Sequence, residues 1–175
     1  MTAWEANVRK VVPYVPGEQP KIDNIIKLNT NENPYGPSPR VKDIVMDMDK
    51  LKLYPDPAAS ALVDAIADYH GVTSDKVFVG VGSDDVLAMS FLTFFNSGKD
   101  ILFPDITYSF YDVWADLYKI PYRAVPVDED FRLRKEDYYV DNGGVIFPNP
   151  NAPTSIAEPL SFVEDIVKNN QDVVV

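Results

Sequence analysis

The stretch KVFVGVGSDDVLAMSFLTFFNSGKDILFPDITY, residues 76–108, decides the fold. It contains a short apolar run at Val77–Val81, a helical pattern at Ser83–Phe95 and a second apolar run at Ile101–Phe103. Apolar runs that alternate with helical patterns are typical of parallel strands covered by helices on both faces. The stretch therefore predicts an α/β fold with a largely parallel sheet.

The same alternation continues to the end of the sequence. Helices are expected at Tyr108–Tyr118 and at about Leu160–Asn169. Further strands are expected at Tyr122–Val127, Val145–Phe147 and Val173–Val175. Because the last apolar run has the pattern of a buried strand, which more structure normally follows, we expect this chain to be the N-terminal part of a longer protein. A self-contained small domain that ends in an edge strand is the alternative.

The first 75 residues predict an extended arm followed by helices. The arm, residues 1–37, is rich in prolines, which favour extended and turn structure. Ser38 and Pro39 can start a helix that continues to about Leu51, and a second helix is expected at about Ala58–Tyr69, before Gly71. Apolar residues recur at helical spacing in the first of these helices: Val41, Ile44, Val45 and Met48. We therefore divide the chain into an arm (1–37), small-domain helices (38–75) and the first part of a large domain (76–175).

The composition limits the class of protein. With 46% hydrophobic and 25% charged residues, the chain is typical of a globular protein. Its formal net charge of -11 argues against a nucleic-acid partner. The absence of cysteine excludes disulfides and thiolate metal sites, and no metal site is predicted. We find no apolar stretch long enough to span a membrane, so a cytoplasmic protein is expected.

A phosphate could bind where Gly80–Asp85 leads from a strand into a helix. Gly82 allows the backbone to approach a ligand closely, Ser83 is a good N-cap, and the first amides of the helix point toward an anion. Plain helix capping explains the same residues, because the acidic Asp84 also stabilises a helix start. A dinucleotide site is disfavoured, because Asp85 stands where the third glycine of that motif is expected.

Residues that follow two other predicted strands are suited to binding a heteroaromatic ring. Tyr108 follows the Ile101–Phe103 strand, at the same sheet edge as Ser83, and its side chain could stack on a flat heteroaromatic ring. Asn151 lies in a proline-rich loop after the next strand and could bind a ring oxygen. A core tyrosine and an ordinary turn are the alternative interpretations.

Five spaced fragments resemble the N-terminal half of the histidinol-phosphate aminotransferases, a class II subgroup of the fold-type I pyridoxal-phosphate aminotransferases. They are LNTNENPYGP (Leu28–Pro37), LYP (Leu53–Pro55), GSDD (Gly82–Asp85), PDITY (Pro104–Tyr108) and NPNAPT (Asn149–Thr154). The resemblance spans nearly the whole chain. It implies pyridoxal phosphate as cofactor, a homodimer, and amino transfer between histidinol phosphate and 2-oxoglutarate or glutamate in histidine biosynthesis.

The resemblance also assigns cofactor contacts to matching positions. Ser83 and Asp84 would hold the cofactor phosphate at the helix start, and Tyr108 would stack on the pyridine ring. Tyr54 would reach across a dimer interface to the phosphate in the partner's site.

Two positions match the family's substrate contacts, and two others depart from its pattern. Tyr14 and Asn33 would line the substrate side of the site. The family usually has asparagine directly before Pro-Thr-Gly, whereas this chain has Ala152 there and Ser155 in place of the glycine. Since alanine cannot hydrogen-bond the ring hydroxyl, Asn151 is the nearest amide that could replace it.

By resemblance, the Schiff-base lysine, an aspartate for the pyridine nitrogen and a substrate-binding arginine follow Val175. No catalytic residue is therefore expected within the chain, which should be inactive alone, and Lys99 and Lys168 are interpreted as solvated charges. Three alternatives remain: another pyridoxal-phosphate aminotransferase, a phosphothreonine decarboxylase, or a noncatalytic α/β phosphate-binding domain.

Overall fold

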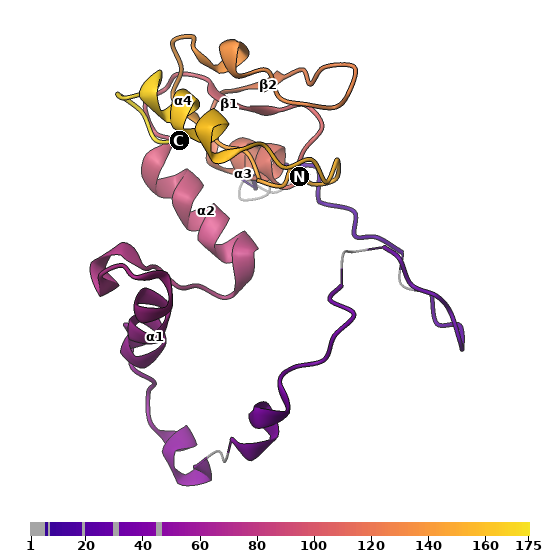
Figure 1. Ribbon diagram of the computed structural model, residues 1–175, viewed down its shortest axis with the longest axis vertical. Coiled ribbons are helices and arrows are strands. Elements are labelled where there is room, and N and C mark those ends of the chain that lie inside the picture. The colour runs from indigo at the N-terminus through magenta and orange to yellow at the C-terminus, as the bar shows by residue number, and fades with distance from the viewer. Residues whose placement is uncertain (1–5, 7, 19, 30–31, 45–46) are drawn as a thin grey trace. The chain divides into compact units, whose positions relative to one another are not determined.

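The computed structural model describes residues 6, 8–18, 20–29, 32–44 and 47–175. These described residues form two compact units, one within residues 1–14 and 80–175 and the other within residues 15–79. The first unit contains the sheet, and the second contains a helix and several short helical turns (Figure 1).

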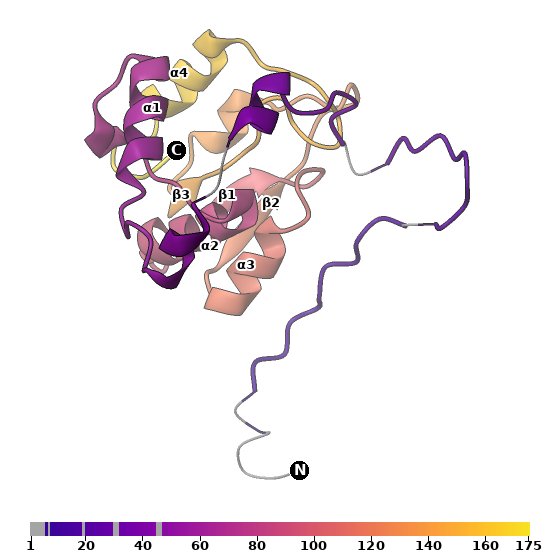
Figure 2. The ribbon, with the colours of Figure 1, turned by 90° about the horizontal axis from the view of Figure 1, so that it is seen from below.

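The sheet has three parallel strands in the order β2-β1-β3. β1 (Ile101–Pro104) lies in the centre, between β2 (Tyr122–Val125) and β3 (Gly144–Val145) (Figure 2). All four residues of β1 are buried, as expected for a strand with neighbours on both sides and helices on both faces. The predicted α/β class with parallel strands is confirmed.

Alternate residues of β1 face two different helical layers. Ile101 and Phe103 pack in a cluster with α2 (Gly82–Phe94) and α3 (Tyr111–Tyr118). Leu102 belongs to a second cluster, which contains Ile166 of α4 (Leu160–Lys168) and Tyr138 of the 3₁₀ helix Lys135–Tyr138. This alternation is the period of two that a strand imposes on its side chains. Packing on both faces therefore fixes the position of β1 between the two helical layers.

The Val15–Val79 unit is mostly irregular. Its helix α1 (Ser60–His70) ends at Gly71, whose φ of 66° is the left-handed conformation predicted for the glycine after that helix. The described residues of the unit also form three 3₁₀ turns: Pro39–Asp43, Met48–Lys52 and Ser74–Lys76.

The predicted continuous helix from Ser38 to Leu51 is wrong. Ser38 does cap a helical start, because its Oγ accepts a hydrogen bond from Arg40 N–H at 3.4 Å. Among the described residues of this segment, however, the helical structure is limited to the two short 3₁₀ turns. Ile44 and Met48 are 72% and 70% exposed, so no packed face extends the helix. Val45, and Thr30 and Asn31 of the LNTNENPYGP fragment, lie outside the described residues.

The predicted strand at Val77–Val81 is also wrong. Phe78 and Val81 are 67% and 92% exposed, and no strand among the described residues pairs with this segment. A strand needs a neighbour for its backbone hydrogen bonds, which local sequence does not supply. Val173–Val175 likewise forms no strand, although Val145 N–H donates to the Val174 carbonyl at 2.9 Å.

Candidate cofactor site

The start of α2 differs from its prediction by one residue. α2 begins at Gly82 with Val81 as N-cap, so Ser83 lies in the first helical turn and its predicted capping role is wrong. Oδ2 of Asp85 instead accepts a hydrogen bond from Val81 N–H at 3.2 Å, which ties the turn together. A side chain reaching back in this way satisfies one of the free donors at a helix start.

Two glycines keep this turn open. A Cβ on Gly80 would lie 2.8 Å from Oδ2 of Asp85, so a larger residue would disturb the turn. Gly82 has a φ of 83°, and no atom lies within 4 Å of its Cβ position. The backbone N–H groups of Ser83 and Asp84 find no acceptor in the part of the chain that the structure describes. Free amides beside open space suit an anion such as a phosphate.

Tyr108 lies against this helix start. Its O–H donates to Oδ1 of Asp84 at 2.6 Å, and its ring meets Tyr111 edge-on at 5.9 Å between centroids. Burial, followed by the hydrogen bond to Asp84, raises the pKa of Tyr108 above its ordinary value. Tyr108 therefore stays a neutral donor, and its ring is held beside the α2 amides.

Asn151 joins the loops that follow β1 and β3. Its side chain is buried, and its Oδ1 accepts a hydrogen bond from Thr107 Oγ1 at 2.9 Å. Its Nδ2 donates to the Ile106 carbonyl at 2.9 Å and to Thr154 Oγ1 at 3.2 Å. Both amide hydrogens thus have acceptors within the chain, so a bond to a cofactor oxygen would have to replace one of them.

The departures from the family pattern lie in the same loop. The Asn149–Pro150 and Ala152–Pro153 peptide bonds are both cis. Ser155 has a φ of 61°, and its N–H donates to the Asn151 carbonyl at 2.7 Å. Ser155 thus adopts the left-handed conformation that the family's glycine enters without steric cost.

Phe110, which the sequence did not single out, connects Tyr14 to Tyr108. The ring centroid of Tyr14 lies 4.5 Å from that of Phe110, which in turn lies 5.7 Å from the ring of Tyr108. The signal for Phe110 was its spacing of four residues from Trp114, which places both rings on one helical face.

Asn33 and Tyr54 belong to the Val15–Val79 unit and are described within that unit only. Oδ1 of Asn33 accepts a hydrogen bond from Tyr35 N–H at 3.0 Å, and the side chain of Tyr54 is 100% exposed. Their predicted contacts with substrate and cofactor stay predictions.

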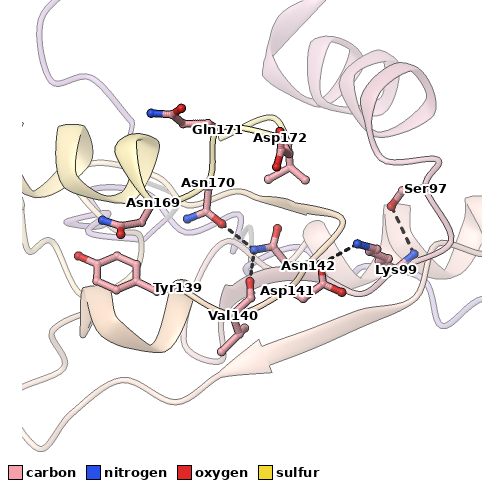
Figure 3. Close-up of a pocket in the computed structure, with 11 residues that line it drawn as sticks. Ser97, Lys99, Tyr139, Val140, Asp141, Asn142, Asn169, Asn170, Gln171 and Asp172 are labelled. Atoms are coloured by element: carbon pink, nitrogen blue, oxygen red, sulfur yellow. Dashed lines mark hydrogen bonds and ion pairs between the residues drawn. The ribbon is translucent and has the colours of Figure 1, made fainter.

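A separate pocket of about 340 Å³ lies near the opposite, amino ends of β1 and β3 (Figure 3). Lys99 Nζ pairs there with Asp141 at 2.6 Å, and Asn142 Nδ2 donates to Asn170 Oδ1 at 2.7 Å. Elsewhere, Lys168 pairs with Glu164 at 3.2 Å. Lys99 and Lys168 both remain more than half exposed, which is consistent with their interpretation as solvated charges.

The described part of the chain contains no helix that could span a membrane. Within the same residues, no group of three His, Cys, Asp or Glu side chains could hold a metal ion.

The geometry defines an α/β protein in which a free helix start, a tyrosine ring and an amide-bearing loop meet at the carboxyl ends of parallel strands. A solved structure from Erwinia carotovora atroseptica, provisionally named histidinol-phosphate aminotransferase, has this fold, with a TM-score of 0.72 and 20% identity. The match covers 87% of this chain and 46% of that one. Residues 23–175 match the model for aminotransferase class I and II, and the chain belongs to this family.

Curated relatives narrow the similarity to one group within the family. The chain is 53% identical over 174 residues to histidinol-phosphate aminotransferase 1 of Hydrogenovibrio crunogenus, and 55% identical over 174 residues to that of Methylococcus capsulatus. It is 50% identical over 175 residues to the histidinol-phosphate aminotransferase of Lactococcus lactis subsp. cremoris. These matches cover 98–99% of this chain but 49% of each relative, so the chain spans about half their length. The resemblance identified from the sequence is confirmed.

Proposed function

We propose that this chain forms part of a pyridoxal-phosphate-dependent aminotransferase that transfers an amino group between histidinol phosphate and 2-oxoglutarate, in cytoplasmic histidine biosynthesis. The observation that carries the proposal is the hydrogen bond from Tyr108 to Asp84, which holds an aromatic ring beside the free amides of α2. The names of relatives that are 50–55% identical support this choice of substrate.

The residues at this helix start fit a phosphorylated ring. The free N–H groups of Ser83 and Asp84 would bind the phosphate, because helix-start amides are preorganised donors for anions. Tyr108 would support the ring by stacking, and Asn151 would lie near a ring oxygen. The cofactor, when bound, supplies the carbonyl group and the electron-withdrawing ring that amino transfer requires.

The hydrogen bond from Tyr108 defines the proposed role of the Asp84 carboxylate. A free carboxylate beside a phosphate would repel it, because like charges in a partly buried site interact unfavourably. Oδ1 of Asp84 instead accepts the O–H of Tyr108, which spreads part of its charge into that hydrogen bond. The pair would therefore orient Tyr108 and leave the backbone amides to the phosphate.

Tyr14 and Asn33 are proposed substrate contacts, and Tyr54 is a proposed contact to the phosphate held by a partner subunit. The full exposure of Tyr54 leaves its side chain available for contact with a second copy of the chain. A homodimer would use each copy of Tyr54 in the other copy's site. The lysine that holds the cofactor covalently is proposed to lie beyond Val175.

Visible absorbance tests the proposal. The native full-length protein should show an absorbance band with pyridoxal phosphate that borohydride abolishes and that histidinol phosphate shifts. The 175-residue chain should show neither change, because the proposed covalent attachment lies outside it. The same titration with phosphothreonine and with other amino acids distinguishes the related pyridoxal-phosphate enzymes.

A full-length protein that binds phosphate but forms no borohydride-sensitive band would exclude the aminotransferase and support a noncatalytic phosphate-binding domain. A band that responds to phosphothreonine and not to histidinol phosphate would support pyridoxal phosphate as the cofactor but exclude histidinol phosphate as the substrate.

A further inference from the structure

Four aromatic rings form a continuous row from the arm along α3. Phe110 stacks on Trp114 with centroids 5.9 Å apart and an interplanar angle of 27°. Trp114 stacks on Tyr118 at 6.0 Å and 14°. The spacing of four residues places these side chains on one face of the helix. Tyr14 of the arm adds the fourth ring, at 4.5 Å from Phe110.

Phe110 is where this row meets the candidate cofactor site. Its ring contacts Tyr14 on the arm and Tyr108 at the cofactor site, at interplanar angles of 31° and 33°. A second contact holds the arm on the same helix, because the Arg9 guanidinium donates to the Leu117 carbonyl. The arm is thus attached to α3 at two points, and Phe110 is the one next to the site.

We propose that Phe110 is a positioning residue that seats Tyr14 beside Tyr108 and thereby sets the affinity for the amino substrate. The effect on affinity rests on the proposed function, whereas the seating of the arm does not. An aromatic pair contributes enough to change an equilibrium by on the order of tenfold. Removing the ring should therefore release Tyr14 from the site without removing any group that touches the cofactor.

The proposed role of Phe110 in positioning Tyr14 can be distinguished from a role in stabilising the fold. Phe110 is half-buried and belongs to neither core cluster. The backbone bond that starts α3, from Trp114 N–H to the Phe110 carbonyl at 3.0 Å, does not depend on the side chain. A Phe110→Ala protein should therefore keep its fold.

Limited trypsin digestion of the native full-length protein, without cofactor or substrate, measures the seating, because Arg9 and Lys10 are cleavage sites in the arm. In Phe110→Ala, cleavage after Lys10 should be roughly tenfold faster than in the unmodified protein, while the free energy of unfolding is nearly unchanged. Phe110→Tyr, which keeps the ring, should restore slow cleavage. Phe94→Ala is the control, because Phe94 is a 54% exposed phenylalanine on α2. Unchanged cleavage of the arm in Phe110→Ala would overturn the proposal.

Steady-state kinetics measure the consequence for the substrate. Phe110→Ala should raise KM for histidinol phosphate by about threefold to tenfold and leave kcat within about twofold, with Phe110→Tyr near the unmodified value. A loss confined to kcat, or an unchanged KM with a loosened arm, would overturn the role in substrate affinity. Should the unmodified protein lack transaminase activity, the proposed function fails, and the trypsin experiment still decides whether Phe110 seats the arm.

Discussion

The Gly80–Val175 region and the Val15–Val79 unit differ in how far large apolar side chains are buried. In the first, Phe91, Ile101 and Ile166 are all 0% exposed. In the second, Leu28 and Tyr35 are 88% and 82% exposed. The first region holds Tyr108 and Asn151 by contacts within the chain, whereas Tyr54 of the second is fully exposed. Under the proposed function, Tyr108 and Asn151 are self-positioned, whereas Tyr54 would be partner-positioned by a second copy of the chain.

The largest expected effect comes from replacing phenylalanine with alanine at one buried position and at one exposed position. Phe91→Ala should lower the free energy of unfolding by about 3–5 kcal/mol, because it leaves a cavity between α2 and the sheet. Phe78→Ala, at a 67% exposed phenylalanine of the other unit, should change it by less than about 0.5 kcal/mol. Urea denaturation of both variants measures the difference. Equal losses would mean that the Val15–Val79 unit also carries a packed core at Phe78.

A buried polar pair gives the next largest effect. Asn170 is 7% exposed, and its Nδ2 donates to the Ile166 carbonyl at 2.9 Å and to the Tyr138 carbonyl at 3.1 Å. Asn170→Ala should cost about 1–3 kcal/mol, because Asn142 and these carbonyls lose their partner. Asn169→Ala, at the exposed neighbour, should cost about 1 kcal/mol or less. Chemical denaturation compares the two, and a larger loss at Asn169 would contradict the assignment of Asn170 to the interior.

Two tyrosine hydroxyls should then behave differently. Tyr108→Phe should reduce stability by about 1 kcal/mol through loss of the bond to Asp84, in any oligomeric state. Tyr54→Phe should leave the stability of the chain unchanged, but it should weaken cofactor binding by the full-length protein about tenfold if Tyr54 contacts the partner's phosphate. Thermal unfolding and a cofactor titration separate the two outcomes. Unchanged cofactor affinity in Tyr54→Phe would count against a partner-positioned tyrosine.

The smallest effect concerns backbone strain in the two regions. Ser155 and Asn24 both have positive φ, 61° and 60°. Ser155→Gly should stabilise the protein by about 0.5 kcal/mol, because relief of left-handed strain exceeds the added entropy of the unfolded chain. Asn24→Gly should be nearly neutral or slightly unfavourable, because asparagine enters this conformation at little cost. Differential scanning calorimetry checks both, and destabilisation by Ser155→Gly would show that its side chain is required in the loop.

The sequence predicted most reliably what depends on local pattern. α4 and β1 were each placed to within about one residue, because apolar periodicity and the residues that end each segment agree there. The proximity of the Tyr108 loop to Asn151 followed from the rule that parallel strands present their carboxyl ends at one edge. The position of Asp84 beside Tyr108 does not follow from that rule, because no strand of the described sheet precedes Asp84. That rule requires only that the strands be parallel.

The sequence could not predict features that depend on distant partners. Val77–Val81 has the composition of a strand but lacks a paired neighbour among the described residues. Met48 has helical spacing but lies 70% exposed, so periodicity alone does not create a buried face. Phe110 was missed because its importance arises from Tyr14, nearly a hundred residues away in the sequence.

The position of β1 between β2 and β3 has a consequence for synthesis on the ribosome. Ile101 pairs with Tyr122 on one side and with Gly144 on the other, so both neighbours of the central strand are translated after it. Until residue 145 has left the exit tunnel, one edge of an apolar strand stays without its permanent neighbour. Parallel pairing of this kind forms slowly and exposes unpaired edges to other chains. The nascent polypeptide should therefore be prone to aggregation, and in need of chaperones, from the emergence of β1 until β3 has left the tunnel.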